Sequence, residues 1–281
     1  MKRCEARGAL GREIEAARAA SQRIALVPTM GYLHEGHLSL IDRARECADR
    51  TVVSIFVNPL QFGPDEDFER YPRDVERDAA LAKARGADIL FVPPTEELYP
   101  RGEPAVQVVA PGLSDRLCGA FRAGHFRGVL TVVAKLFNIA RPDVAVFGRK
   151  DFQQLVLIRR MAADLDFAVD IVDAPIVREA DGLALSSRNV YLSPEERLDA
   201  TLLHRALEEA QAAFSAGETD PDRLIAVAAR RLEVGRHVRP QYIELVDAIT
   251  LDRARPAYAG AVMALAAHVG RTRLIDNHTL A

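Results

Sequence analysis

The stretch between residues 24 and 48 constrains the fold of this chain more than any other. It begins with four apolar residues, 24–27, whose length and composition are typical of a strand buried in a parallel sheet. Pro28 lacks a backbone N–H and is expected to end this strand. From Leu38 onward, apolar residues recur at helical spacing. The stretch therefore predicts a strand, a loop, and a helix whose N-terminus faces the carboxyl end of the strand.

The predicted loop contains two glycines, Gly31 and Gly36, and two histidines, His34 and His37. Open α/β sheets bind ligands at the carboxyl ends of their strands, and a helix N-terminus offers backbone N–H groups to an anion. Gly36 lets a ligand approach the backbone, and imidazole N–H groups can donate to phosphoryl oxygens. The loop therefore favours a phosphate site. Two alternatives remain open: the histidines could be surface or helix-capping residues, or a metal pair, although no histidine or cysteine nearby completes such a site.

Buried runs and helical patterns continue to alternate through the first part of the chain. Strands are predicted at residues 51–57, 88–92, 106–109, 143–147, 167–172 and 174–177, and helices at 10–20, 74–85, 128–138 and 152–161. This order predicts right-handed crossovers and a parallel sheet. We therefore expect an α/β, Rossmann-like nucleotide-binding domain at residues 1–177.

The remaining residues predict a smaller α+β domain at 178–281. Ser193 and Pro194 are typical of a helix start, and the helix is expected to extend to about Ser215. A second helix at 221–232 precedes three strands at 241–246, 261–268 and 273–277. We expect this domain to cover the active site.

Polar residues follow two further strand ends. Asn58 and Gln61 come after the strand at 51–57, and their amides can donate and accept at once, which suits a ligand with hydroxyls and a carboxylate. The alternative is that they only cap a turn. Lys150 follows the strand at 143–147, where it could neutralise triphosphate oxygens or be a solvated charge. Gln154 is expected on the first turn of the next helix, facing the same site.

A third polar segment contains Ser186, Ser187 and Arg188. It is either an ordinary helix-capping segment or a phosphate clamp made of two hydroxyls and a guanidinium group.

Composition narrows the class of protein. The chain has 281 residues, 49% of them hydrophobic, and a net charge of −3, which gives no reason to expect a nucleic-acid partner. Its three cysteines, Cys4, Cys47 and Cys118, are scattered and fit a reducing compartment. The first residues contain no apolar segment typical of a signal peptide, and no uncharged stretch is long enough to span a membrane. We expect a cytoplasmic enzyme.

The His-x-Gly-His sequence at a strand–helix junction is similar to the signature of the nucleotidyltransferase superfamily, whose members act at the α-phosphate of a nucleoside triphosphate. A narrower resemblance extends over about two-thirds of the chain. Five ordered motifs, at residues 28–37, 56–63, 125–133, 147–154 and 178–189, closely resemble those of the pantothenate synthetases, also called pantoate–β-alanine ligases.

The resemblance implies a two-step reaction on small-molecule substrates. The carboxylate of pantoate attacks the α-phosphate of ATP, bound with Mg²⁺, to form pantoyl adenylate and pyrophosphate. The amine of β-alanine then displaces AMP to form pantothenate. Adenylation brings one anion up to another, so cationic and N–H donors are needed where charge develops. The resemblance also implies a homodimer.

The same resemblance assigns roles to residues. His34 and His37 are expected to hydrogen-bond the phosphates, with His37 the stronger candidate for proton donor. Lys150 is expected to stabilise the α- and β-phosphates, while Ser186, Ser187 and Arg188 hold the β and γ groups. The catalytic set is thus His34, His37, Lys150 and Arg188. The full ATP-binding set comprises Met30, Gly31, Tyr32, Leu33, His34, Glu35, Gly36, His37, Gly148, Arg149, Lys150, Asp151, Val177, Leu185, Ser186, Ser187 and Arg188. Gln61, Gln154 and Asn58 are expected to bind pantoate, and Gln61 also β-alanine; the sequence assigns no metal ligands.

Two positions depart from the family pattern. Arg149 stands where glutamate is frequent, and Phe152 where tyrosine is common. An Arg149 that points into the site would add positive charge beside the triphosphate, whereas one that points away would change nothing.

Two competing functions remain. A nucleotidyltransferase that keeps the nucleotide on its product would share the histidine loop, but it would not be expected to pair Asn58 and Gln61 with Gln154. A non-catalytic ATP-sensing module would have no need of Lys150 at a strand end.

Overall fold

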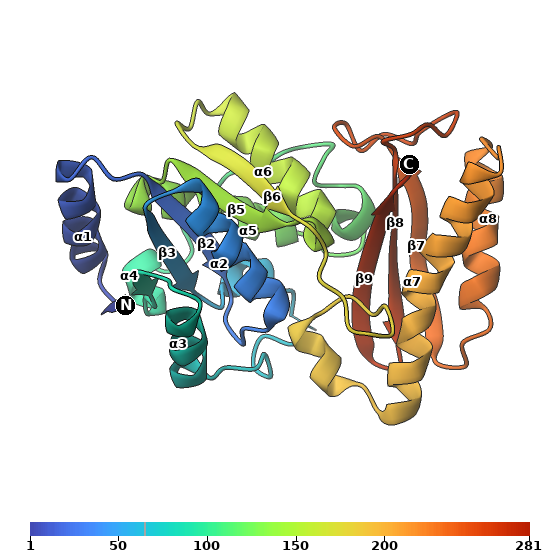
Figure 1. The fold of residues 1–281 in the computed structure, drawn as a ribbon, viewed down its shortest axis with the longest axis horizontal. Coiled ribbons are helices and arrows are strands. Elements are labelled where there is room, and N and C mark those ends of the chain that lie inside the picture. Colours follow the sequence, from blue (N-terminus) through green and yellow to red (C-terminus); the bar gives the residue numbers. More distant parts are fainter. Residues whose placement is uncertain (65) are drawn as a thin grey trace. The chain divides into compact units, whose positions relative to one another are not determined.

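Six parallel strands form one sheet of this chain in a computed structural model, which describes residues 1–64 and 66–281. A second sheet has three antiparallel strands. The chain divides into two compact units. The first contains Met1–Ser114, Arg122–Arg149 and Leu157–Pro175, and the second Asp115–Phe121, Lys150–Val156 and Ile176–Ala281. The predicted class, a Rossmann-like parallel sheet followed by a smaller α+β part, is confirmed (Figure 1).

The parallel sheet has the strand order β1-β4-β3-β2-β5-β6. Its strands are β1 (Lys2–Cys4), β2 (Ile24–Thr29), β3 (Arg50–Ile55), β4 (Ile89–Phe91), β5 (Val144–Gly148) and β6 (Asp170–Ala174). From β2 the chain first proceeds to β3 and β4 on one side and later to β5 and β6 on the other. The order of strands therefore reverses between β2 and β5, which is where open α/β sheets bind ligands.

The helices along this part of the chain are α1 (Arg7–Ala19), α2 (Glu35–Cys47), α3 (Val75–Ala84), α4 (Thr95–Leu98), α5 (His125–Ala140) and α6 (Phe152–Asp164). Helix α2 packs against β2, β3, β5 and β6 (Figure 1). Its apolar face, with Leu38, Ile41 and Ala44, joins a core of buried residues from β2, β3 and β5. This packing holds the N-terminus of α2 at the carboxyl ends of the central strands.

Several strands of this unit differ from the sequence-based predictions. Strand β2 continues through Pro28 and pairs with β3 as far as Thr29. Proline is tolerated because β5 pairs with β2 only at Ala25 and Leu26, so the missing N–H falls where β2 has a single hydrogen-bonded neighbour. One strand, β6, replaces the two predicted at 167–172 and 174–177. Strand β1, an addition at the sheet edge, was not predicted.

The predicted strand at 106–109 is wrong. Val106 is 87% exposed and Val109 59% exposed, so neither valine packs on a sheet face. The Val108 N–H donates to the Thr131 hydroxyl of α5 at 3.0 Å. β-branched residues favour strands only where a sheet surface is there to pack against, and this segment has none.

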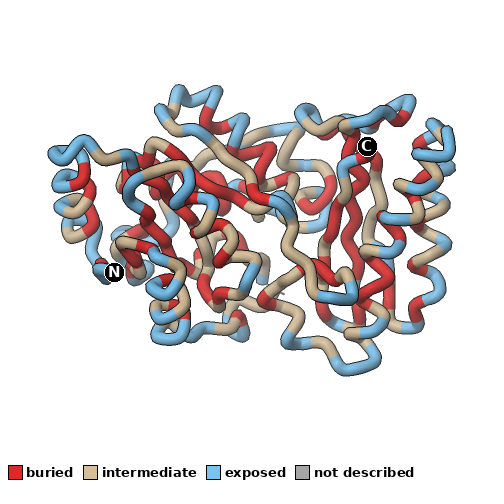
Figure 2. The backbone as a smooth tube through the Cα atoms, viewed as in Figure 1, coloured by how far each residue is buried: buried red, intermediate tan, exposed pale blue. Residues whose placement is uncertain are grey.

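The second unit contains a three-stranded sheet in the order β7-β8-β9 covered by two helices. Its elements are α7 (Pro194–Ser215), α8 (Pro221–Leu232), β7 (Val238–Val246), β8 (Val262–Val269) and β9 (Thr272–Thr279). Ser193 caps α7 in a capping box with Glu196, which confirms the predicted helix start. The core lies between the sheet and the two helices, and β8 is buried over almost its entire length (Figure 2).

No helix in the described part of the chain is long and apolar enough to cross a membrane.

Candidate active site

Strands β2 and β5 are neighbours at their beginnings but not at their carboxyl ends. Their pairing stops at Leu26 and Ala145, whereas β2 continues to Thr29 and β5 to Gly148. The two strands therefore separate at the point where the strand order reverses. The loop at residues 30–34 leaves β2 at this edge, and Arg149 leaves β5 beside it. Topology thus brings two of the predicted phosphate-binding segments to one edge of the sheet.

The two histidines cap helix α2. The His34 Nδ1 accepts from the Gly36 N–H at 3.2 Å, and the His37 Nδ1 accepts from the His34 N–H at 3.4 Å. The His34 side chain also accepts from the His37 backbone, which completes a capping box between the two histidines. Their rings lie 4.1 Å apart between centroids. A nitrogen that accepts from a backbone N–H carries no proton, so each neutral ring has its proton on Nε2. The cap thus fixes both rings as Nε2–H donors at a helix N-terminus, which joins the capping and phosphate interpretations.

A buried carboxylate holds the backbone of the same loop. Asp78 of α3 is 1% exposed and accepts from the N–H groups of Tyr32 at 2.6 Å and Leu33 at 2.7 Å. Burial raises the pKa of Asp78 above its ordinary value, although these hydrogen bonds and the Arg77 guanidinium act in the opposite direction. Gly31 has φ +85°, and a Cβ there would lie 2.9 Å from Ile55 and 3.0 Å from Asp78. The loop conformation therefore requires glycine at this position.

Asn58 and Gln61 form one hydrogen-bonded group after β3. Asn58 is 1% exposed; its Nδ2 donates to Gln61 Oε1 and to the Gly128 carbonyl, both at 3.1 Å. Its Oδ1 accepts from the Tyr99 hydroxyl at 2.8 Å and from the Leu60 N–H at 3.3 Å. Because its amide is fully engaged, Asn58 holds Gln61 rather than presenting its own amide to a ligand.

Gln61 is placed between two parts of the parallel-sheet unit. Its Nε2 donates to the Met30 sulfur at 3.0 Å, so the side chain reaches the loop after β2. Its short 3₁₀ turn, Pro59–Gln61, packs on Gly128 of α5. A Cβ at Gly128 would overlap the Leu60 carbonyl and lie 2.7 Å from the Gln61 nitrogen. The absence of a side chain at Gly128 therefore allows this approach.

A polar chain supports the Gln61 carbonyl. The carbonyl accepts from His125 Nδ1 at 2.8 Å, and His125 Nε2 accepts from the Arg122 guanidinium at 2.8 Å. Because a carbonyl only accepts and a guanidinium only donates, the His125 tautomer is fixed as neutral Nδ1–H. Arg122 also binds Glu66 through two nitrogens at 2.6 Å each. Burial raises the pKa of Glu66, but the hydrogen bonds and charge of Arg122 outweigh it and hold this pKa below its ordinary value.

The Arg149 side chain pairs with strand β6. Its Nε pairs with Asp173, which also binds Arg159 of α6. Burial raises the pKa of Asp173, yet the two guanidinium groups lower it overall. The positive charge of Arg149 is therefore balanced by the Asp173 carboxylate of β6.

The other predicted phosphate-binding residues belong to the second unit. Lys150 and Asp151 occupy a short 3₁₀ turn, Arg149–Asp151, and Gln154 lies half-buried in the first turn of α6. Val177 and Leu185 are joined by a backbone hydrogen bond of 3.0 Å, which closes the loop between them. Ser186 caps the turn Ser187–Tyr191 by accepting from the Arg188 N–H at 3.3 Å. This cap fixes the backbone at residues 186–188, and their assignment to phosphate stays a prediction.

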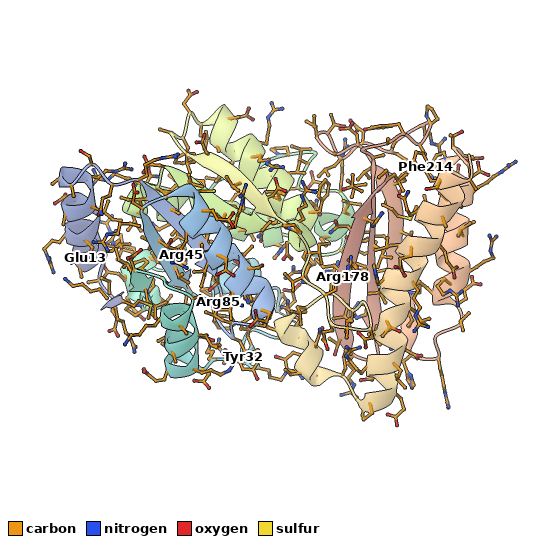
Figure 3. All side chains as sticks on the ribbon, viewed as in Figure 1. Glu13, Tyr32, Arg45, Arg85, Arg178 and Phe214 are labelled. Atoms are coloured by element: carbon orange, nitrogen blue, oxygen red, sulfur yellow. The ribbon has the colours of Figure 1, made fainter. Side chains whose placement is uncertain are left out.

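Two members of the predicted ATP-binding set contact other parts of the protein. Leu33 is fully buried in the core, so only its backbone can reach a ligand. The Glu35 carboxylate pairs with Arg85 at the end of α3 (Figure 3).

Sequence reasoning missed the residues that hold the predicted ones in place. These supporting residues are Asp78, Tyr99, Arg122, His125 and Gly128. Only Gly128 had a local signal, because a glycine inside an otherwise apolar helix indicates a close backbone approach.

Comparisons with known proteins give a consistent result. A model of the family described as "Pantoate-beta-alanine ligase" matches residues 3–279. The chain is 56% identical to "Pantothenate synthetase 1" of Bradyrhizobium diazoefficiens over 273 residues, which cover 96% of this chain and 95% of that protein. It is 52% identical to "Pantothenate synthetase" of Acetivibrio thermocellus over 254 residues, 90% of each chain.

Solved structures agree. Pantothenate synthetase from Thermus thermophilus superposes with a TM-score of 0.93 at 46% identity, covering 100% of this chain and 99% of that one. The pantoate-beta-alanine ligase from Francisella tularensis, described as complexed with "Beta-gamma ATP and Beta-alanine", superposes with a TM-score of 0.83 at 30% identity, covering 99% of this chain and 97% of that one.

Proposed function

The chain belongs to the pantoate–β-alanine ligase family, and from this we propose how its residues join pantoate to β-alanine with ATP. In the first step a carboxylate oxygen of pantoate forms a bond to the α-phosphorus, and the bond to the bridging oxygen of pyrophosphate breaks. In the second step the β-alanine nitrogen attacks the acyl carbon, loses a proton, and AMP leaves with the carboxyl oxygen. The product is pantothenate.

The observation that carries this proposal is the separation of β2 and β5 beside the capped N-terminus of α2. Their pairing ends at Leu26 and Ala145, and two imidazoles with protonated Nε2 atoms lie at the end of the loop from β2. Donors fixed before the substrate arrives need no reorganisation when charge develops on the phosphate. Neutral imidazoles suit this role because their hydrogen bonds to backbone keep them oriented.

Positive charge is supplied by residues of the second unit. We assign the Lys150 ammonium to the α- and β-phosphates as a point charge. Its contact with these phosphates is stronger in the transition state than in the ground state. Arg188, with its guanidinium fork, and the hydroxyls of Ser186 and Ser187 hold the β and γ groups. The capping turn at Ser187–Tyr191 orients this segment.

Amides select the hydroxy acid. Gln61 and Gln154 bind the hydroxyls and carboxylate of pantoate, and Gln61 also helps to place β-alanine. Asn58 serves this site by holding the Gln61 side chain at 3.1 Å. An amide both donates and accepts, so it matches a ligand that carries hydroxyls beside a carboxylate.

The adenosine part is held mainly by backbone and packing. The residues we assign to it and to the adjoining phosphate loop are Met30, Gly31, Tyr32, Leu33, Glu35, Gly36, Gly148, Arg149, Asp151, Val177 and Leu185. Leu33 and Glu35 contribute through their backbone, since their side chains are committed elsewhere.

Magnesium enters as part of the substrate. Mg²⁺ is usually held by one or two carboxylates together with substrate phosphates, so a triphosphate carries most of its ligands. Among the described residues there is no group of three His, Cys, Asp or Glu side chains that could hold a metal ion. We also propose a homodimer and a cytoplasmic location, the latter because the three cysteines are free.

The test is substrate dependence. With ATP, Mg²⁺ and pantoate, the protein should exchange labelled pyrophosphate into ATP; adding β-alanine should release one AMP for each amide formed. Nucleotide retained on the product would instead favour a nucleotidyltransferase of the same superfamily. Binding of ATP with no exchange under any substrate combination would favour a sensing module.

A further inference from the structure

Strand β9 carries two buried polar residues in sequence, Asp276 and Asn277, which are 3% and 6% exposed. Successive side chains of a strand point to opposite faces of the sheet, so these two serve different neighbours. Buried polar groups are retained in folded proteins when they are hydrogen-bonded. Their partners therefore indicate what this part of β9 supports.

Asp276 anchors the loop that contains residues 186–188. Its two carboxylate oxygens accept from the Arg178 guanidinium at 2.6 and 2.9 Å, and Arg178 also donates to the Gly182 carbonyl at 3.1 Å (Figure 3). Such a bidentate pair fixes orientation as well as distance. The Asp276 Oδ1 further accepts from the Asn277 N–H at 2.8 Å. The loop and the backbone of Asn277 therefore share one rigid anchor.

Asn277 contacts the backbone of the lysine assigned to the triphosphate. Its Nδ2 donates to the Lys150 carbonyl at 3.0 Å, a contact between residues 127 positions apart in the chain. Both residues belong to the second unit. The next turn is also fixed there, because the buried Gln153 accepts from the Cys118 N–H at 2.9 Å and donates to the Arg116 carbonyl at 2.7 Å. Lys150 thus precedes a helix start that side chains of this unit hold in place.

We propose that Asn277 is a positioning residue for Lys150 in adenylate formation. Through the Lys150 carbonyl it fixes the start of the lysine side chain, and through Asp276 and Arg178 the same strand fixes the loop with residues 186–188. The small sheet thereby sets the spacing between the Lys150 ammonium and the donors at residues 186–188 within the second unit. This inference rests on the proposed role of Lys150. Transition-state contacts are sensitive to such spacing, because a shift of about 1 Å can slow a reaction about 100-fold.

The informative variant is Asn277→Asp, which keeps the shape of the side chain but cannot donate to the Lys150 carbonyl. We expect its maximal pantoate-dependent pyrophosphate–ATP exchange to fall about 10- to 100-fold. The KM for ATP should change about threefold or less, because ground-state binding has many other contacts. Asn277→Ser, which lacks the reach to Lys150, should give the same pattern and serves if the aspartate variant folds poorly.

Thr272→Ala is the matched control. Thr272 lies on the same strand, is also 6% exposed, and faces Val269 in the hairpin rather than Lys150. We expect a comparable loss of thermal stability but exchange within about twofold of the wild type. A lower maximal rate with a nearly unchanged KM in the Asn277 variants, but not in Thr272→Ala, distinguishes positioning of Lys150 from general loosening of the sheet.

Two outcomes overturn the inference. One is wild-type exchange in both Asn277 variants, and the other is an equal slowing in Thr272→Ala. Lys150→Ala distinguishes this failure from failure of the proposed function. If Lys150→Ala loses exchange while the Asn277 variants keep it, only the positioning role is rejected; if Lys150→Ala itself exchanges normally, the role of Lys150 is rejected as well.

Discussion

The two units hold the segments that we propose to bind phosphate in opposite ways. In the parallel-sheet unit, a side-chain acceptor holds backbone donors: Asp78 binds the N–H groups of Tyr32 and Leu33. In the second unit, a side-chain donor holds a backbone acceptor: Asn277 binds the Lys150 carbonyl. The first arrangement shapes a loop that ends at a capped helix, and the second fixes a single residue before a helix.

This difference follows from what each segment contributes. The loop after β2 contributes backbone and two imidazoles whose orientation comes from the cap of α2, so the loop itself must be shaped. Lys150 contributes one charge at the end of a flexible side chain, so only its starting point can be fixed. The comparison predicts that variants of the lysine affect the rate most, and variants of the supporting residues affect it less.

The largest effect is expected for Lys150→Ala. Loss of the ammonium should raise the barrier of adenylate formation by about 2–4 kcal/mol, with a smaller change in ATP binding. The measurement is pantoate-dependent pyrophosphate–ATP exchange. Arg159→Ala, which removes a cation bound to Asp173 on the exposed side of α6, is the control and should stay close to the wild type. A near wild-type exchange rate in Lys150→Ala would contradict the assignment.

A large effect in the parallel-sheet unit is expected for Gly128→Ala. The added methyl group would overlap the Leu60 carbonyl, so α5 must move from the turn that carries Gln61. We expect a loss of about 3 kcal/mol in the free energy of unfolding, with a raised KM for pantoate. Gly11→Ala is matched, since Gly11 is also helical but a Cβ there would meet nothing within 4 Å. That control should be neutral or stabilising by about 0.5–1 kcal/mol, and equal losses in both variants would contradict the packing argument.

These supporting residues mark the limit of what the sequence could predict. The strands and helices follow local patterns of apolar residues, and the capping of α7 by Ser193 is visible in four consecutive residues. Asp78, by contrast, lies in a strongly charged segment and looks like a surface residue. Its role depends on contacts 45 and 46 positions away in the chain.

The wrong strand predictions also arise from contacts between residues distant in sequence. Whether Pro28 ends a strand depends on how far the neighbouring β5 remains paired, and whether residues 106–109 form one depends on a partner strand. The exposed β1 needed the edge of β4 to form. Each outcome is decided by a neighbour distant in sequence, which no local pattern encodes.

Replacement of Asp78, the carboxylate that shapes the loop after β2, is expected to have an intermediate effect. In Asp78→Asn, one oxygen is replaced by an amide N–H₂ that cannot accept, so one buried N–H of Tyr32 or Leu33 loses its partner. We expect a cost of about 1–2 kcal/mol in the free energy of unfolding and a raised KM for ATP in the exchange assay. Asp74→Asn, at the N-cap of the same helix, should change neither, because asparagine caps as well as aspartate. An unchanged KM in Asp78→Asn would show that the loop keeps its shape without the second acceptor.

The smallest effect is expected for Glu66→Gln, which removes the charge opposite Arg122. Because the pKa of Glu66 is lowered in the folded protein, the ion pair contributes fully above the ordinary pKa of 4.5 and is lost as the pH falls through the lowered value. At neutral pH the variant should therefore be less stable by about 1 kcal/mol, and the difference should shrink near pH 3. Urea denaturation at both pH values measures it, with Glu46→Gln, an exposed partner of Arg43, as a control expected to show almost no difference at either pH. A constant difference at both pH values would mean that Glu66 acts through packing, and that the Gln61 carbonyl is held without help from this charge.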